Sequence, residues 1–120
     1  MISIIITSFN EPKTIGRAID SFLNQDIKEK YELIVAAPDK QTWDIVEKYE
    51  KTNKNIRLFK DPGKGKSYAL NLLLPTLRGG VLIFTDGDVY VSENSVEEIL
   101  RKFEDNRVGC VAGFPVSLEP

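Results

Sequence analysis

Hydrophobic and polar positions along the chain repeat in one order, a short apolar run followed by an amphipathic segment. Residues 2–7 are β-branched and apolar apart from Ser3, which is typical of a central parallel strand buried on both faces. Similar runs predict further strands at residues 31–37, 56–59, 81–85 and 108–112. Five strands are therefore expected in one sheet.

The segments between the strands have helical spacing. The first helix is predicted after Asn10 as N-cap, with Pro12 in its first turn and an apolar face formed by Ile15, Ala18, Ile19, Phe22 and Leu23. A second helix passes through Trp43, Val46 and Tyr49, and a third covers residues 67–77, where Pro75 should kink or end it. The Ser95–Glu98 pattern has the form of a capping box and opens a fourth helix.

Strands that alternate with helices predict an α/β fold, a three-layer α/β/α arrangement around a mostly parallel sheet. If the first three strands run outward and the fourth returns beside the first, the strand order is 3-2-1-4. Ligands of such sheets bind beyond the carboxyl ends of the strands, at the point where the order reverses. Residues 7–11 and 86–88 follow the first and fourth strands, so we expect them to meet there.

Composition narrows the possible functions. The 120 residues suit one domain, and a net charge of −2 gives no basic footprint for nucleic acid. The absence of histidine removes serine–histidine and cysteine–histidine catalysis and histidine-ligated zinc. The single cysteine, Cys110, lies in an apolar run and is expected to be buried and reduced. With no signal peptide or membrane-spanning run, a cytoplasmic protein is expected, and peripheral association with a membrane surface is left open.

The sequence Asp86-Gly87-Asp88 ends the fourth predicted strand with two carboxylates. Such carboxylates repel each other and lose hydration near an apolar interior, and a divalent cation removes both penalties. Mg²⁺ or Mn²⁺ held by Asp86 and Asp88, with a substrate phosphate completing the shell, is one interpretation. An ordinary Asp-Gly turn is the other.

Other candidates also have two readings. The loop containing Lys64 and Lys66 fails the P-loop pattern. Its lysines at a helix N-terminus could attract a diphosphate, or the loop could simply be a solvated basic segment. Asp39 could contact a ribose or base, or cap the helix that follows it. Phe9 could stack on a base or belong to the core. Glu11 could have no role beyond a favourable interaction with the dipole of the helix that follows it. Neither a calcium loop nor a dinucleotide-binding glycine fingerprint is present.

Taken in order, four segments resemble the family 2 glycosyltransferases of the GT-A fold: Ile6–Glu11, the strand that ends at an acidic turn near Asp39, Gly65–Asn71 and Phe84–Asp88. The resemblance covers the whole chain, residues 1–120, as a single Rossmann-like, nucleotide-sugar-binding domain without the acceptor half. It implies that Asp86, Gly87 and Asp88 form the DxD motif for metal and diphosphate. It also implies a nucleotide pocket lined by Thr7, Phe9, Glu11, Asp39 and Lys66. Where the family usually has a pair of aspartates after the second strand, this chain has Ala37 and Pro38, with Asp39 one residue later.

The function implied is transfer of a sugar from a UDP- or GDP-sugar, with Mg²⁺ or Mn²⁺, to an unidentified acceptor. The catalytic base is not identified, because inverting members carry it after the region seen here. We therefore expect nucleotide binding without transfer, and an exposed apolar rim that favours homo-oligomers. A non-catalytic nucleotide-sugar-binding or interaction module is an alternative. A sugar-phosphate nucleotidyltransferase is another, although it should have a glycine-rich basic loop where Ser8-Phe9-Asn10 stands.

Overall fold

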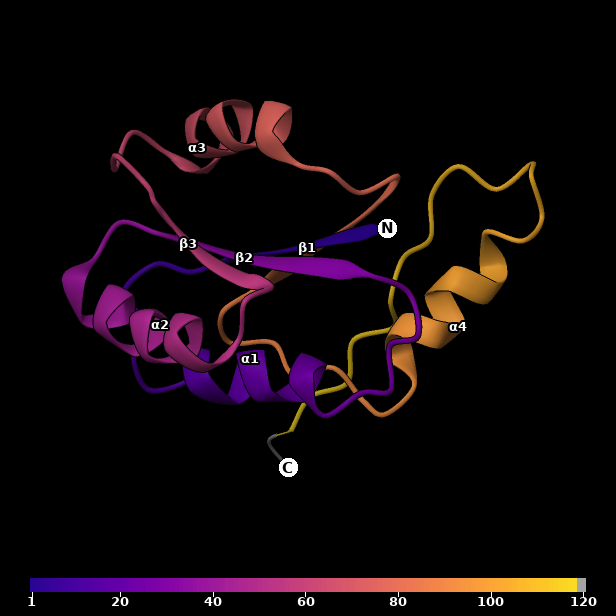
Figure 1. Cartoon of the computed structure of the whole chain (residues 1–120), viewed down its shortest axis with the longest axis horizontal. Helices are drawn as coiled ribbons and strands as arrows, with labels where there is room; N and C mark the ends of the chain where they lie inside the picture. Colours follow the sequence, from indigo (N-terminus) through magenta and orange to yellow (C-terminus); the bar gives the residue numbers. More distant parts are fainter. Residues whose placement is uncertain (119–120) are drawn as a thin grey trace.

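The protein is built on a parallel four-stranded sheet. The computed structural model describes residues 1–118, and in that range the strands are β1 (Ile2–Thr7), β2 (Tyr31–Ala37), β3 (Ile56–Lys60) and β4 (Val81–Asp86). They lie side by side in the order β3-β2-β1-β4 (Figure 1). The predicted order and the pairing of the first strand with the fourth are confirmed.

Helices cover both faces of the sheet. The helices are α1 (Ile15–Leu23), α2 (Lys40–Thr52), α3 (Lys66–Leu73) and α4 (Ser95–Lys102). Figure 1 shows α1 and α2 on one face and α3 on the other, which gives the three layers expected from the sequence. After Leu73 the chain tightens into a short 3₁₀ helix, Leu74–Thr76, because Pro75 cannot continue an α-helix. Among residues 1–118, no helix is both long enough and apolar enough to cross a lipid bilayer.

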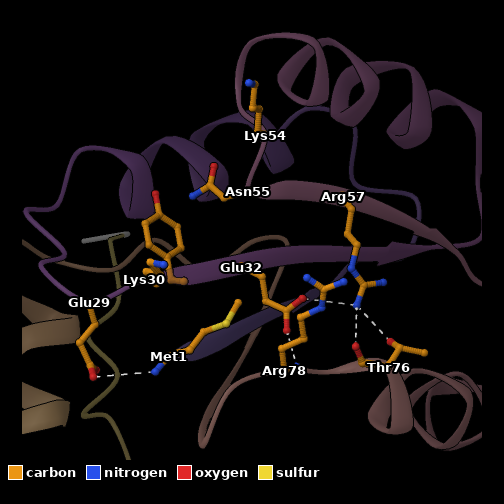
Figure 2. Close-up of a pocket in the computed structure, with 10 residues that line it drawn as sticks. Met1, Glu29, Lys30, Glu32, Lys54, Asn55, Arg57, Thr76 and Arg78 are labelled. Atoms are coloured by element: carbon orange, nitrogen blue, oxygen red, sulfur yellow. Dashed lines mark hydrogen bonds and ion pairs between the residues drawn. The ribbon is translucent and has the colours of Figure 1, made fainter.

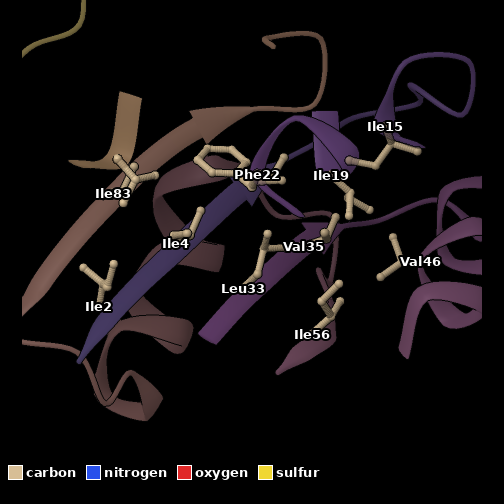
Figure 3. Close-up of a cluster of buried hydrophobic side chains, with 12 residues drawn as sticks. Ile2, Ile4, Ile15, Ile19, Phe22, Leu33, Val35, Val46, Ile56 and Ile83 are labelled. Carbon is tan, nitrogen blue, oxygen red and sulfur yellow. The ribbon is translucent and has the colours of Figure 1, made fainter. Parts of the chain in front are cut away.

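The core lies mainly between the sheet and the layer that contains α1. Alternate residues of β1 and β2 point to this side, where they pack on α1, α2 and α4 (Figure 3). The buried side chains of this cluster include Ile2, Ile4, Ile6, Ile15, Ile19, Phe22, Leu33, Val35, Val46, Ile56, Ile83 and Val96. On the opposite face Ile5 and Ile34 pack under Leu73 of α3. Burial on both faces explains why β1 and β2 read as nearly continuous apolar runs.

The strand register sets the position of the candidate site. Thr7, the last residue of β1, pairs with Asp86 on one side and with Ala36 on the other. The carboxyl ends of these strands therefore reach the same edge of the sheet, as predicted.

Two helix starts differ from the predictions. The first helix begins at Ile15 with Thr14 as N-cap, because Asn10 has a left-handed backbone (φ 51°) and residues 11–14 form turns. The capping box does not form: Asn94 is the N-cap of α4, and the Ser95 hydroxyl donates to the Ser92 carbonyl instead.

The predicted fifth strand is wrong. Residues 108–112 have no regular secondary structure, and the four-stranded sheet contains none of them. An apolar run becomes a strand only where a neighbour pairs with it, and here the run is interrupted by the exposed Gly109. Cys110 is likewise exposed, because it has no sheet to be buried in, which corrects the expectation of a buried thiol.

Candidate functional site

A pocket of about 240 Å³ lies at the carboxyl edge of the sheet. Its walls come from the ends of β1, β2, β3 and β4 and from the start of α3. Among the residues predicted from the sequence, Thr7, Phe9, Glu11, Lys66 and Asp86 line it. These five come from three separate segments of the chain, and the fold brings them together.

Asp86 is the centre of the polar contacts in this pocket. Its Oδ1 accepts a hydrogen bond from the Thr7 hydroxyl at 2.9 Å and an ion pair from Lys66 Nζ at 3.1 Å. Partial burial opposes ionisation, but the hydrogen bonds from Lys66 and Thr7 and the charge of Lys66 outweigh it and lower the pKa of the Asp86 carboxyl. Asp86 is therefore held ionised, with both of these contacts on one of its two oxygens.

Gly87 is needed where it stands. A Cβ at this position would lie 2.5 Å from Ser8 Oγ and 2.8 Å from Ser8 Cβ, so a side chain there would clash with the end of β1. The Gly87 amide donates to the Thr7 carbonyl at 2.9 Å, and the Val89 amide closes a turn onto the Asp86 carbonyl. The turn interpretation is thus correct for the backbone, and it leaves the side chains of Asp86 and Asp88 exposed.

The loop after β1 presents an aromatic ring to solvent. Phe9 is 76% exposed, so it does not belong to the core. Glu11 does not cap a helix; its Oε1 accepts hydrogen bonds from the Phe9 amide and the Ser8 hydroxyl, which folds the loop back on itself. This arrangement leaves the ring of Phe9 in the wall of the pocket.

Asp39 caps the helix that follows it, which is one of its two predicted roles. It is the N-cap of α2, where Oδ2 accepts from the Thr42 amide and hydroxyl, and Oδ1 accepts from the Asn10 amide at 2.9 Å. Burial raises the pKa of this carboxyl, and the hydrogen bonds from Thr42 and Asn10 lower it by more. Asp39 joins the ends of β1 and β2, but it is not among the residues that line the pocket.

The loop between β3 and α3 forms the opposite wall. Gly63 and Gly65 both have positive φ angles, 79° and 101°, and both line the pocket. Lys64 is turned away over the ring of Tyr68, so Lys66 is the lysine of this loop that reaches Asp86. Asp61 also lines the pocket and was missed in the sequence. Its signal was available, because it is the first carboxylate after the third predicted strand.

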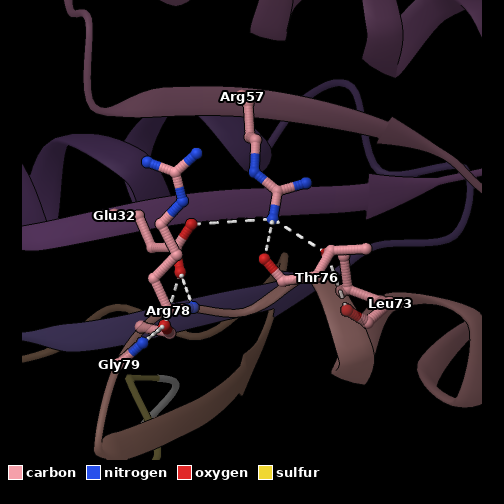
Figure 4. Close-up of polar contacts among 7 residues, drawn as sticks. Glu32, Arg57, Leu73, Thr76, Arg78 and Gly79 are labelled. Atoms are coloured by element: carbon pink, nitrogen blue, oxygen red, sulfur yellow. Dashed lines mark hydrogen bonds and ion pairs between the residues drawn. The ribbon is translucent and has the colours of Figure 1, made fainter.

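A larger hollow of about 770 Å³ lies at the opposite, amino edge of the sheet (Figure 2). Its floor is a buried carboxylate, Glu32, which accepts from the Ser3 hydroxyl and the Arg78 amide at 2.6 Å each (Figure 4). Arg57 lies 3.6 Å from the other oxygen and also donates to Thr76. Burial opposes ionisation of Glu32, and these contacts outweigh it and lower its pKa. Through these contacts Glu32 joins the segment that precedes β4 to β2 and β3, which is a structural role.

The carboxyl edge also has donors suited to a divalent cation. Residues 1–118 contain no group of three or more histidine, cysteine, aspartate or glutamate side chains placed to hold a metal by themselves. Asp86 and Asp88 nevertheless supply two exposed carboxylates, separated by Gly87. Hard cations take such oxygens and keep positions for water or phosphate, so the residues present fit a metal that is shared with a phosphate-bearing ligand.

Known proteins are similar to this chain in sequence and in fold. Residues 3–118 match the model of glycosyl transferase family 2. The uncharacterized glycosyltransferase EpsJ of Bacillus subtilis (strain 168) is 32% identical over 115 residues, which cover 92% of this chain and 33% of EpsJ. The chain thus spans about a third of the length of this relative.

Two solved structures are similar in fold. The mannosyltransferase PcManGT from Pyrobaculum calidifontis, in complex with GDP-Man and Mn²⁺, superposes with a TM-score of 0.81 at 23% identity, covering 90% of this chain and 33% of that one. TarS 1-349 of S. aureus in complex with UDP-GlcNAc gives a TM-score of 0.72 at 26% identity, covering 88% and 32%. The family match extends over nearly the whole sequence, and the chain therefore belongs to glycosyl transferase family 2.

Proposed function

We propose that this chain binds a nucleoside-diphosphate sugar at the carboxyl edge of its sheet, as the donor-binding part of a sugar transferase. The observation that carries the proposal is the convergence on Asp86: Thr7 from β1 and Lys66 from α3 meet this carboxylate in a pocket that also contains Phe9. An anionic diphosphate needs cationic partners, and an aromatic ring offers a surface on which a base can stack.

Each part of the pocket has a role in this proposal. Lys66 and the first turn of α3 bind the diphosphate, because a cationic side chain and a helix N-terminus both attract anions. Phe9 stacks on the base. Gly63 and Gly65 let the backbone come close to the ligand, since neither has a side chain in the way.

Asp86 and Asp88 would hold Mg²⁺ or Mn²⁺ together with the diphosphate oxygens. The metal supplies positive charge that stabilises the departing diphosphate when the sugar leaves it. PcManGT was solved with GDP-Man and Mn²⁺, which supports a divalent metal in this fold without choosing between the two ions for this chain.

Transfer of the sugar requires a general base, which binding of the donor does not. The bond from the anomeric carbon to the diphosphate breaks, a bond to the acceptor oxygen forms, and a general base takes the acceptor proton. Two carboxylates of the pocket are already engaged, since Glu11 holds the β1 loop and Asp86 would face the metal. The third, Asp61, follows β3, three strands away from Asp86. Glu97 and Glu98 pair with Arg101 on α4. We therefore propose that these 120 residues bind donor but transfer no sugar by themselves.

We also propose self-association through β4, which is one of the two edge strands of the sheet. Leu82 is 38% exposed and Phe84 52%, so two large apolar side chains of this strand face solvent.

Calorimetric titration of UDP-sugars and GDP-sugars with and without Mn²⁺ tests the binding proposal. We expect metal-dependent binding that Asp86→Asn weakens by about tenfold or more, the loss of one charge-assisted contact. Asp105→Asn, which removes the same charge from an exposed pair with Arg107, is the matched control and should leave affinity unchanged. Binding of equal strength in EDTA would refute the metal role, and rapid glycosylation of an added acceptor would refute the absence of a base. Pyrophosphate release from a nucleoside triphosphate and a sugar 1-phosphate would indicate a nucleotidyltransferase instead.

A further inference from the structure

We propose that a line of polar side chains along α1 and just beyond its end, formed by Arg17, Ser21 and Gln25, positions Asp88 for the metal by holding the loop that follows β4. This inference rests on the proposed function, because it assumes that Asp88 and Asp86 share a divalent cation with a nucleoside diphosphate. It assigns a positioning role to three residues that lie outside the pocket.

The spacing of the three residues places them on one side of the helix. They are four positions apart, which corresponds to about one helical turn between neighbours. The Ser21 hydroxyl donates to the Ala18 carbonyl at 2.7 Å, and Gln25 Nε2 donates to the Ser21 carbonyl at 3.1 Å. Both side chains thus use their donors on α1 and keep an oxygen with which to accept a hydrogen bond from another segment.

These two oxygens accept hydrogen bonds from the segment between β4 and α4. Ser21 Oγ accepts from the Val91 amide at 3.2 Å, and Gln25 Oε1 accepts from the Val96 amide at 3.0 Å. The second bond supplies a cap that α4 lacks, because its N-cap residue, Asn94, makes no side-chain cap hydrogen bond. The end of α1 therefore fixes both the loop and the start of the helix that follows it.

Arg17 makes the contact nearest to the metal turn. Its guanidinium lies 4.2 Å from the centre of the Tyr90 ring, which is a favourable cation–π arrangement. Tyr90 is only two residues after Asp88, and it is half-buried in this position. The three contacts follow the chain in order, from Tyr90 to the first turn of α4.

Asp88 depends on these contacts because its side chain has no anchor of its own. Within residues 1–118 the exposed Asp88 carboxylate forms no hydrogen bond or ion pair, whereas Asp86 is held by two neighbours. The position of Asp88 is set by the backbone on either side of it. On one side the Val89 amide closes the turn onto the Asp86 carbonyl, and on the other the loop is held on α1.

Releasing the loop from α1 would leave Asp86 in place and let Asp88 move. The cation would then have to order this part of the chain when it binds. Ordering roughly one residue's backbone corresponds to about a tenfold loss of affinity. We therefore expect the loss to appear in the requirement for metal, and not in the contacts that the nucleotide makes elsewhere in the pocket.

The test is calorimetric titration of UDP and of GDP at a series of Mn²⁺ concentrations, with circular dichroism and urea unfolding to check the fold of each variant. Ser21→Ala removes the acceptor, and Ser21→Thr retains a hydroxyl that can also bond a carbonyl of the preceding turn. Gln25→Met is an independent variant that removes the bond to Val96. The matched controls are Thr52→Ala, which removes a hydroxyl that donates to a carbonyl three residues back in α2, and Gln41→Met, which replaces an exposed glutamine of the same helix.

In Ser21→Ala and in Gln25→Met, the Mn²⁺ concentration that supports half-maximal nucleotide binding should rise by about tenfold, with binding recovered at higher Mn²⁺. Arg17→Met, which loses the charge over Tyr90, should raise it by about threefold. Ser21→Thr and both controls should match the wild type.

An unchanged Mn²⁺ requirement in both Ser21→Ala and Gln25→Met would overturn this inference while leaving donor binding in place. A loss of binding that excess Mn²⁺ does not recover would overturn it as well, because a merely structural role of α1 would weaken the whole pocket. Wild-type binding that is independent of Mn²⁺ would refute the metal role and this inference together. If the wild type bound neither UDP nor GDP, the proposed function itself would fail.

Discussion

Replacing Glu32 by glutamine should destabilise the fold without affecting nucleotide binding. Glu32 is 10% exposed at its side chain and accepts two hydrogen bonds of 2.6 Å, from Ser3 and Arg78. Hydrogen bonds to a charged group contribute about 1.5–3 kcal/mol, against about 1 for neutral ones. The neutral amide weakens both bonds and loses the attraction of the half-exposed Arg57, so we expect a loss of about 2 kcal/mol.

The loss of stability in Glu32→Gln should depend on pH. The pKa of Glu32 is lowered from 4.5 in the folded protein, so its ionised form stabilises the fold above that pH. This contribution disappears as the pH falls through the lowered value. The difference in unfolding free energy between wild type and Glu32→Gln should therefore be full at neutral pH and shrink as the pH falls below 4.5 and through the lowered pKa of Glu32.

Urea unfolding at about pH 7 and about pH 3.5, followed by far-ultraviolet circular dichroism, measures both effects. Glu29→Gln is the control, because Glu29 lines the same hollow with a 53% exposed side chain and a single ion pair of 3.9 Å. It should change stability by less than about 0.5 kcal/mol. If Glu32→Gln left stability unchanged and weakened nucleotide binding, the larger hollow would be a functional site and its structural assignment wrong.

Three further predictions concern the carboxyl edge and the open strand. Gly87→Ala should weaken nucleotide binding and lower stability by about 1–3 kcal/mol, because its Cβ would lie 2.5 Å from Ser8 Oγ; calorimetry and urea unfolding measure these. Lys66→Met should change stability by less than about 1 kcal/mol, since its pair with Asp86 is exposed, yet it should weaken nucleotide binding and raise the pKa of Asp86 toward its ordinary value in an NMR titration. Phe84→Ser should shift the chain toward monomer in sedimentation velocity, and an unchanged distribution would exclude β4 as the contact.

Most of the fold could be predicted because its local signals agree with its topology. Residues 2–7 are apolar enough to be buried on both faces, residues 81–85 form a similar apolar run, and alternation with helices leaves few ways to connect them. The strand at 108–112 failed because hydrophobicity does not supply a pairing partner. The start of α1 failed because Asn10 is held by Asp39, a contact between residues 29 positions apart that no local pattern records.

The candidate site was predictable in location but only partly in detail. The reversal of strand order pairs the backbone of Thr7 with that of Asp86, and this pairing does not depend on the contacts of their side chains. What each carboxylate does depends on which donors happen to lie near it, and this is decided by tertiary packing. The Asp39 carboxylate accepts hydrogen bonds from Thr42 and Asn10 and caps α2, whereas within residues 1–118 only one oxygen of Asp61 accepts a hydrogen bond. The exposure of Phe9 could not be predicted from the sequence either, since an aromatic residue after a strand is more often buried.

The contacts of Asp86 explain why metal and nucleotide should bind together rather than singly. Without ligand, Lys66 neutralises this carboxylate through an exposed pair, which is weak and easily exchanged. A cation binding alone must compete with the charge of Lys66, and a diphosphate binding alone must approach the negative charges of Asp86 and Asp88. If both bound, the cation would take the carboxylates and Lys66 would be released to the diphosphate, so every charge would gain an opposite partner. We therefore expect Asp86, Asp88 and Lys66 to make each ligand bind weakly by itself and the two ligands bind cooperatively.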